Sequence, residues 1–342
     1  MTATLLATHR VEKPWGRHKL WPGFADPAAD QDPVGEVWFQ TPGNSTPDLL
    51  IKYLFTSEKL SVQVHPDDAQ AQAKGLPRGK DECWVILDAE PDSTIALGTK
   101  QPVDRETLRA AALDGSIENL LDWKPVKAGD FFYSASGTVH AIGAGITLVE
   151  VQQNSETTYR LYDYGRPREL HLEDGVAVSD PVPYVPHPMP GKIADDRTIL
   201  VEGPKFVLER WEGGRRNLTL PEGVTGWLVP LAGEGVVDGV AFHAGECVTL
   251  TGECALHVRP VRVQRIHRGA EQTTAINCAK NIRELALQEP LATLPHARSR
   301  IEPRDVARHE IARPRRQHRP RVGECAAEQH DQDDQRQQQR EQ

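Results

Sequence analysis

Short runs of apolar residues that alternate with polar positions dominate the first half of the chain, and this period of two is typical of β-strands. Such runs lie at residues 49–55, 60–65, 83–87, 94–97, 130–133, 138–142 and 146–151. Residues 10–48 are punctuated by Trp, Pro and Gly, which suits short edge strands rather than helices. The pattern therefore predicts a mainly β fold for this region.

One segment of this region has helical character instead. Residues 104–113 are rich in helix formers and end at Asp114-Gly115, and Ser116 then starts a second helical turn. We expect a small helical insert at about residues 103–123 within the first β domain. A further short helix can begin at the capping residues Asp67-Asp68 and stop at Gly75.

A proline-rich stretch at residues 181–192 predicts a linker between two domains. We assign residues 1–180 to a first domain and residues 193–257 to a second, smaller β domain with Gly-rich turns. The second domain has no cluster of His and Glu comparable to that of the first, so we expect no metal there.

From about residue 258 the apolar periodicity fades, and the chain ends in almost wholly polar, Gln-rich sequence. A segment of this kind buries too little apolar surface to offset its ordering entropy, so we expect residues 258–342 to be disordered. The sequence leaves open whether this segment is a genuine extension or the product of a reading-frame error.

The composition excludes several classes of function. The 342 residues are 38% hydrophobic and 26% charged, which is ordinary for a soluble globular protein. The net charge of -9 argues against nucleic acid or an anionic membrane as the main partner. The start of the chain lacks the apolar core of a signal peptide, and the five cysteines form no C-x-x-C pair. We expect a cytoplasmic protein.

Four residues on or beside the predicted strands have side chains that suit a metal ion. Gln63 and His65 are two positions apart on one strand and therefore lie on the same face. Glu82 begins another apolar strand, and His140 follows a Gly turn. A lone histidine is more often a structural residue than a ligand, but two His, one Glu and one Gln together make a donor set that suits zinc.

Two further charged residues interrupt apolar strands. Lys52 lies inside the run 49–55, where it needs a partner or an anion unless it extends from an edge strand to water. Glu150 alternates with apolar neighbours and shares a face with Leu148, so it faces something polar. For Glu150 the alternative is a structural pair with an arginine.

Several long motifs in one order resemble the type I mannose-6-phosphate isomerases in their short bacterial form. These motifs are residues 50–52, 58–68, 80–82, 137–143 and 152–166, and the likeness runs from about residue 13 to about residue 254. The resemblance implies a fold of two cupin-like (jelly-roll) β domains. It also implies a zinc-dependent aldose–ketose isomerase that interconverts mannose 6-phosphate and fructose 6-phosphate through an enediol(ate).

The resemblance assigns roles to individual residues. One Zn²⁺ per chain would have four ligands, namely Gln63, His65, Glu82 and His140. The groups that face the reacting sugar would be Arg160, Glu150 and Lys80. The residues near the substrate phosphate would be Lys52, Ser61 and Arg166. The implied partner is a hexose 6-phosphate, without nucleic acid or membrane, for a monomer or small homo-oligomer.

One motif departs from the family, and other functions remain possible. The family usually carries Ile-Pro-Ala before Gly-Thr-Val-His, whereas this chain has Ser134-Ala135-Ser136, which loosens the turn that presents His140. The alternatives are a non-catalytic cupin that senses a metal or a sugar, and an inactive product with a disrupted C-terminus. Lys52, Arg160 and Arg166 together favour the enzyme, because a sensor need not combine an oxyanion cation with phosphate binders.

Overall fold

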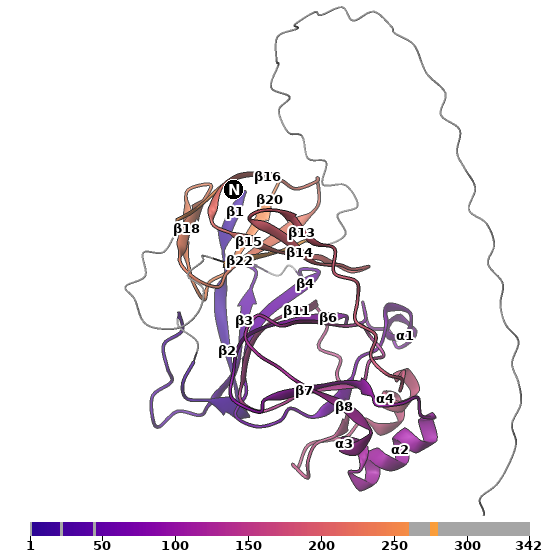
Figure 1. The fold of residues 1–342 in the computed structure, drawn as a ribbon. Helices are drawn as coiled ribbons and strands as arrows, with labels where there is room; N and C mark the ends of the chain where they lie inside the picture. Colours follow the sequence, from indigo (N-terminus) through magenta and orange to yellow (C-terminus); the bar gives the residue numbers. More distant parts are fainter. Residues whose placement is uncertain (1, 21–22, 44–45, 260–273, 280–342) are drawn as a thin grey trace, which may run out of the picture. The chain divides into compact units, whose positions relative to one another are not determined.

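A computed structural model describes residues 2–20, 23–43, 46–259 and 274–279, which form mainly β-strands, as the sequence predicts (Figure 1). The strands pair antiparallel into four sheets, and the described helices are short. None of the helices in the described ranges is both long and apolar enough to cross a membrane.

Two sheets make the first β domain. The six-stranded sheet has the order β2 (Ala7–Arg17), β3 (Val34–Gln40), β4 (Leu49–Phe55), β11 (Ile146–Gln153), β6 (Glu82–Ala89) and β9 (Phe131–Ser134). The five-stranded sheet has the order β12 (Tyr159–Tyr162), β5 (Val62–Val64), β10 (His140–Ile142), β7 (Thr94–Thr99) and β8 (Leu121–Pro125). Side chains of both sheets form one buried cluster that includes Trp84, Leu148, Leu97 and Ile142.

Strand β11 lies in the middle of the six-stranded sheet and is buried on both faces. Leu148 packs between the two sheets of the first domain, whereas Val149 and Val151 pack in a second cluster on the opposite face. Because side chains alternate along a strand, Glu150 lies on the same face as Leu148, as the sequence predicts. This places a carboxylate inside the sandwich.

Helices cover the outer side of the five-stranded sheet. Two of them, α2 (Arg105–Asp114) and α3 (Ile117–Leu120), lie where the sequence predicts a helical insert, and α4 (Leu172–Val178) packs beside them. Leu108 and Val176 share a buried cluster with Val64 and Ala141 of the sheet. The short helix α1 (Asp68–Ala73) begins at Asp67, which forms a capping box with Gln70.

Two further sheets pack around a cluster that includes Trp211, Phe242 and Leu256. The seven-stranded sheet has the order β1 (Ala3–Leu5), β20 (Val248–Thr251), β17 (Thr225–Pro230), β22 (Thr274–Ala279), β15 (Val207–Glu212), β14 (Arg197–Glu202) and β13 (Gly191–Ala194). The four-stranded sheet has the order β16 (Gly214–Thr219), β21 (Glu253–Arg259), β18 (Glu234–Val237) and β19 (Val240–His243).

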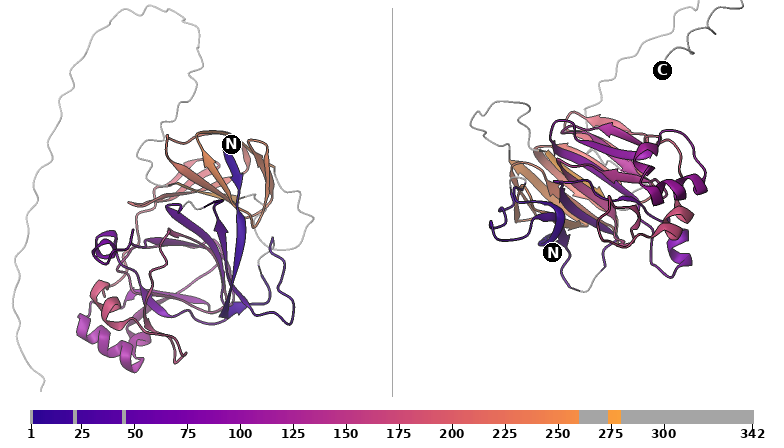
Figure 2. Two further views of the ribbon diagram at one scale, coloured as in Figure 1. Left: turned by 180° about the vertical axis from the view of Figure 1, so that it is seen from behind. Right: turned by 90° about the horizontal axis from the view of Figure 1, so that it is seen from below.

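The six- and seven-stranded sheets face each other as stacked layers (Figure 2). Phe55 and Val151 of the former share a buried cluster with Leu208 and Trp227 of the latter. The two β domains that the sequence suggests therefore share an apolar interface and belong to one compact unit.

Two strands lie outside the domain limits that the sequence suggests. β1 belongs to residues 1–180 in sequence but pairs with β20 of the seven-stranded sheet. β22 lies within the segment 258–342 that we expected to be disordered, and its backbone pairs with β15 and β17. Apart from this strand and the end of β21, that segment lies outside the described residues.

Candidate metal centre

Three predicted metal ligands come together between the two sheets of the first domain. His65 follows β5, Glu82 begins β6 and His140 begins β10. One ligand atom from each lies within 4.8 Å of the other two, and all three residues are buried. The Glu82 carboxylate is the bridge, because its Oε1 lies 3.1 Å from His140 Nε2 and its Oε2 lies 3.5 Å from His65 Nε2.

The hydrogen bonds of the two imidazoles set their tautomers. His65 Nδ1 lies 3.0 Å from the Thr157 carbonyl oxygen, and His140 Nδ1 lies 2.9 Å from the Thr138 carbonyl oxygen. A carbonyl only accepts, so each Nδ1 carries the proton and each Nε2 presents a lone pair toward Glu82. Burial and the neighbouring Lys80 ammonium lower the pKa of His65 to about 3, so this ring is neutral.

This arrangement fits a divalent metal better than a histidine–carboxylate ion pair. Neutral imidazole lone pairs and an ionised carboxylate that converge on one point are the donors that zinc prefers, and the backbone acceptors at Nδ1 are the usual outer partners of such ligands. Burial opposes the ionised form of the Glu82 carboxyl, but the neighbouring Lys80 ammonium helps to keep its pKa well below the ordinary value. The residues therefore fit the predicted zinc ion.

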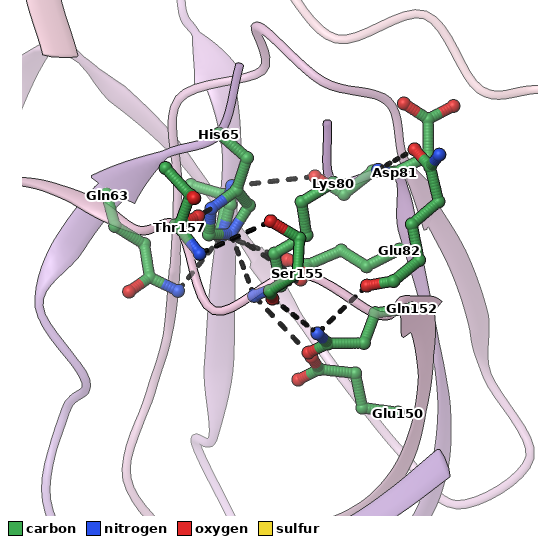
Figure 3. A network of polar contacts seen from close by, with 12 residues as sticks. Gln63, His65, Lys80, Asp81, Glu82, Glu150, Gln152, Ser155 and Thr157 are labelled. Atoms are coloured by element: carbon green, nitrogen blue, oxygen red, sulfur yellow. Dashed lines mark hydrogen bonds and ion pairs between the residues drawn. The ribbon is translucent and has the colours of Figure 1, made fainter. Parts of the chain in front are cut away.

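The predicted fourth ligand, Gln63, lies beside this centre (Figure 3). Strand β5 pairs with β10 so that Gln63 is directly opposite His140, and its Nε2 lies 3.2 Å from His140 Nε2. Ser61 Oγ donates to Gln63 Oε1 over 3.3 Å. A rotation of the amide by half a turn would aim Oε1 at the centre, because the two ends of an amide have nearly the same shape.

Buried charges of alternating sign continue from the centre into the sandwich. Lys80 Nζ lies 3.0 Å from Glu82 Oε2 and 3.8 Å from Glu150 Oε1. Lys52 Nζ lies 3.2 Å from Glu150 Oε1 and 3.2 Å from Glu36 Oε2. Glu150 thus lies between two ammonium groups, and each charge in the row has an opposite neighbour, as burial requires.

The surroundings shift the pKa values of this row. Burial raises the pKa of the Glu150 carboxyl to about 7, although Lys52 and Lys80 oppose the rise. Burial disfavours the Lys52 ammonium, but Glu150 and Glu36 together raise its pKa above the ordinary value. Glu150 therefore exchanges a proton near neutral pH while Lys52 stays charged.

Four members of this row, namely Glu36, Lys52, Glu150 and Lys80, line a cavity of about 560 Å³. Its apolar wall includes Trp15, Trp38 and Leu60, and its hydroxyl groups include Ser61 and Thr158. Six side chains that are or can become cationic reach it, namely Lys13, Lys52, Lys80, Arg160, Arg168 and His171. The site residues that face the cavity are thus mostly positive, which suits an anionic ligand in a chain whose net charge is negative.

The structure brings most of the predicted site residues together but leaves Arg166 outside the cavity. The Arg166 guanidinium donates over 2.8 Å to Asp163 Oδ1 and over 2.8 Å to the Lys59 carbonyl oxygen, and it lines a separate pocket with Tyr164. Arg168 donates to both oxygens of the same Asp163 carboxylate, over 2.6 and 2.7 Å, and reaches the main cavity.

Four charged or titratable residues of the cavity wall were not predicted from the sequence, namely Arg168, Lys13, Glu36 and His171. Arg166 and Arg168 are two residues apart in a turn after β12, where no regular period says which side chain faces the cavity. Glu36 was the more detectable residue, because it is a carboxylate in the otherwise apolar strand β3. Trp38 Nε1 donates to Glu36 Oε2 over 2.7 Å, which helps to hold this buried carboxylate.

The chain is similar to known proteins over part of its length. No family model matches the chain. It is 41% identical over 173 residues to the mannose-6-phosphate isomerase of Streptococcus mutans, a match that covers 48% of this chain and 54% of that protein. It is 43% identical over 174 residues to the mannose-6-phosphate isomerase ManA of Bacillus subtilis, covering 48% and 55%. The chain thus spans about half the length of the curated relatives it matches, and the predicted resemblance is confirmed over that part.

Solved structures extend the likeness to more of the fold. The mannose 6-phosphate isomerase of Bacillus subtilis has a TM-score of 0.67 at 24% identity, covering 82% of this chain and 99% of its own. A zinc-bound mannose 6-phosphate isomerase has a TM-score of 0.60 at 14% identity, covering 82% and 100%. These similarities confirm the predicted cupin-like β fold.

Proposed function

We propose that this chain is a zinc-dependent aldose–ketose isomerase that interconverts mannose 6-phosphate and fructose 6-phosphate. One observation carries the proposal: a cavity lined by several cations and by the buried Glu150 carboxylate, whose pKa is raised to about 7, adjoins a His–Glu–His centre through the contact of Lys80 with Glu82. The names of the matched relatives specify mannose 6-phosphate, and an aldose–ketose isomerisation of this sugar gives fructose 6-phosphate.

The reaction moves a proton between C1 and C2 of the sugar through an enediol(ate), so it needs a base near these carbons and positive charge near the developing oxyanion. A zinc ion at Gln63, His65, Glu82 and His140 would supply Lewis-acid polarisation of the sugar oxygens. We assign proton transfer to Glu150, because its carboxylate is buried and has a raised pKa.

Two cations would stabilise negative charge near the reacting carbons. Lys80 contacts both Glu82 and Glu150, so its ammonium lies between the metal centre and the proposed base. Arg160 is opposite Gln63 across the β5–β12 pair and reaches the same cavity. Both retain the roles that the resemblance implies.

We assign the phosphate group of the substrate to Arg168, with Arg160, His171 and Ser61 nearby in the cavity wall. This assignment replaces Arg166, whose guanidinium is bound to Asp163 and Lys59 away from the cavity. It also changes the expected role of Lys52. The carboxylates of Glu36 and Glu150 already neutralise the charge of the Lys52 ammonium. We therefore propose that Lys52 sets the pKa of Glu150 rather than binding the phosphate.

A coupled assay tests the proposal. The purified full chain, treated with a chelator and then given Zn²⁺, should convert mannose 6-phosphate into fructose 6-phosphate, and it should be inactive before zinc is restored. Unphosphorylated mannose should react far more slowly, since the phosphate supplies binding energy remote from the reacting carbons. A zinc-loaded, folded chain with no conversion in either direction would refute the isomerase and leave a metal- or sugar-binding cupin.

A further inference from the structure

The Asp81 carboxylate is buried next to the metal centre but is not one of its ligands. Asp81 lies between Lys80 and the predicted ligand Glu82 in sequence, and it is 3% exposed. Tyr133 OH donates to Asp81 Oδ2 over 2.6 Å, and the Ser136 backbone N–H donates to Asp81 Oδ1 over 3.0 Å. A buried carboxylate with both oxygens bonded is a strong local constraint.

Ser136 belongs to the turn that presents both histidines. In this turn the Thr138 carbonyl oxygen orients His140, and the Gly137 N–H donates over 2.9 Å to the His65 carbonyl oxygen. Gly137 has a φ of +84°, a conformation that only glycine adopts without strain. The preceding residues include no proline to fix the backbone, and the bond from Ser136 to Asp81 adds to the pairing of Ser134 with Glu82 in tying the turn to strand β6.

The backbone of Asp81 is itself held in place. Its N–H donates over 3.0 Å to Gln153 Oε1, and its carbonyl oxygen accepts over 2.9 Å from the Gln153 N–H. Gln153 ends β11, the strand that carries Glu150. Asp81 therefore links the strand of Glu82, the strand of Glu150 and the turn of His140.

The other donor, Tyr133, is supported from outside the first domain. Tyr184 of the proline-rich connector donates its hydroxyl over 2.9 Å to the Tyr133 carbonyl oxygen. The Tyr133 ring lies with its centroid 4.9 Å from that of His187 and 5.7 Å from that of Phe206 in the second β domain. This packing gives the second domain a route by which it supports the metal centre.

We propose that Asp81 is a positioning residue for the metal centre, holding the 134–140 turn so that the three ligands keep their mutual geometry. The proposal rests on the metal-dependent function proposed above. Asp81 acts through the hydrogen bonds to Ser136 and Tyr133, not through its charge. The turn is also held by the pairing of Ser134 with Glu82, by bonds within itself and by bonds to the chain at His65, Gly98 and Asp180, but none of these bonds involves the Ser136 N–H.

Titration of the metal-free full chain with Co²⁺ tests the proposal without any substrate. Asp81→Ala should raise the Kd for Co²⁺ by about ten- to a hundredfold, the usual effect of losing an outer partner of a ligand. Its cobalt absorption spectrum should change, because ligand angles change. The Ser136 amide should exchange its hydrogen faster, because it loses its acceptor.

Two variants separate hydrogen bonding from charge. Asp81→Asn keeps an oxygen that can accept from Ser136 and an amide that can donate to the Tyr133 hydroxyl, so it should largely restore affinity and spectrum. Tyr133→Phe removes one of the two bonds and should raise the Kd by about two- to tenfold. It also keeps the test decisive if Asp81→Ala does not fold.

The matched control is Asp104→Ala. The Asp104 side chain also accepts a hydrogen bond from a backbone N–H, that of Thr107 at the start of α2. This variant should therefore lower the Tm and leave Co²⁺ binding unchanged. Wild-type affinity and spectrum in folded Asp81→Ala and Tyr133→Phe would overturn the proposal, as would an Asp81→Asn protein as impaired as Asp81→Ala. A wild-type chain that binds Co²⁺ but does not isomerise the sugar refutes the proposed function alone.

Discussion

Glu150 and Lys52 are directly opposite each other on strands β11 and β4, with 3.2 Å between the carboxylate Oε1 and the ammonium Nζ. Both side chains are buried in the sandwich. Glu36 forms a second ion pair with the Lys52 ammonium, and Lys80 forms a second ion pair with the Glu150 carboxylate. The register of two strands thus connects the proposed base with the charges that control it.

Removal of the Lys52 ammonium should strongly destabilise the chain. Lys52→Met leaves two buried carboxylates without their shared partner, and such a loss costs about 3–5 kcal/mol. Urea unfolding of the wild type and the variant at pH 7 measures the difference. Lys13→Met is the control, because Lys13 lies 3.7 Å from the same Glu36 but is 32% exposed, so it should cost at most about 1 kcal/mol. Equal costs in the two variants would contradict the burial argument.

The same substitution should move the pH dependence of turnover. Lys52 lowers the pKa of Glu150, so its removal raises that pKa further. The base must be ionised to accept a proton, and the acid limb of kcat/KM should therefore shift to higher pH in Lys52→Met. Rate profiles between pH 5 and about 9 test this expectation. An acid limb that stays in place or moves to lower pH would exclude Glu150 as the base.

Zinc content and turnover should fall together when a ligand is removed. His65→Ala and His140→Ala each delete a donor atom, and both properties should decrease in parallel. Elemental analysis and the coupled assay on the same preparations measure them. His243→Ala should retain both, because His243 is 63% exposed and far from the centre in sequence. Full activity in a metal-free protein would refute the zinc assignment.

The two arginines that share Asp163 should differ in their effect on the substrate. Arg168→Ala should lower kcat/KM by about ten- to a hundredfold, as expected for a lost charge-assisted hydrogen bond to phosphate. Arg166→Ala is the matched variant, since it breaks a similar ion pair outside the cavity and should leave KM nearly unchanged. If only Arg166→Ala raised KM, the phosphate would belong to the residue that the family motif suggests.

Acid should selectively weaken the contact of Asp68 with Lys205. Asp68 Oδ2 lies 2.5 Å from Lys205 Nζ, and Oδ1 accepts from the Gly79 N–H and the Gln153 amide. Although burial opposes them, these bonds lower the pKa of Asp68 to about 2, below its value in the unfolded chain. The stabilisation is therefore present above about pH 4 and is lost as the pH falls toward 2.

Urea unfolding of wild type and Asp68→Asn between about pH 2 and 6 checks this sign. The difference in unfolding free energy should be constant near pH 6 and shrink as the pH falls. Asp195→Asn is the control, because the Asp195–Lys192 pair is on the surface and should contribute little at any pH. A difference that grows in acid would contradict the assignment of Asp68.

Much of the site can be predicted from the sequence because its residues follow local periods. Gln63 and His65 lie on one face because they are two apart on a strand, and the alternation at 147–152 correctly turns Glu150 inward with Leu148. The motif resemblance indicates the cupin-like fold. These properties depend on residues that are close together in the sequence, so they can be predicted from it.

Only the tertiary structure decides which distant residues meet. Glu36, Lys52 and Glu150 form a row because β3, β4 and β11 pair in one register, and that register depends on contacts between segments up to about a hundred residues apart. The short strands β1 and β22 find partners in the seven-stranded sheet although they are too brief for a clear periodic signal. Arg168 rather than Arg166 reaches the cavity because an irregular turn, not a repeating strand, sets their directions.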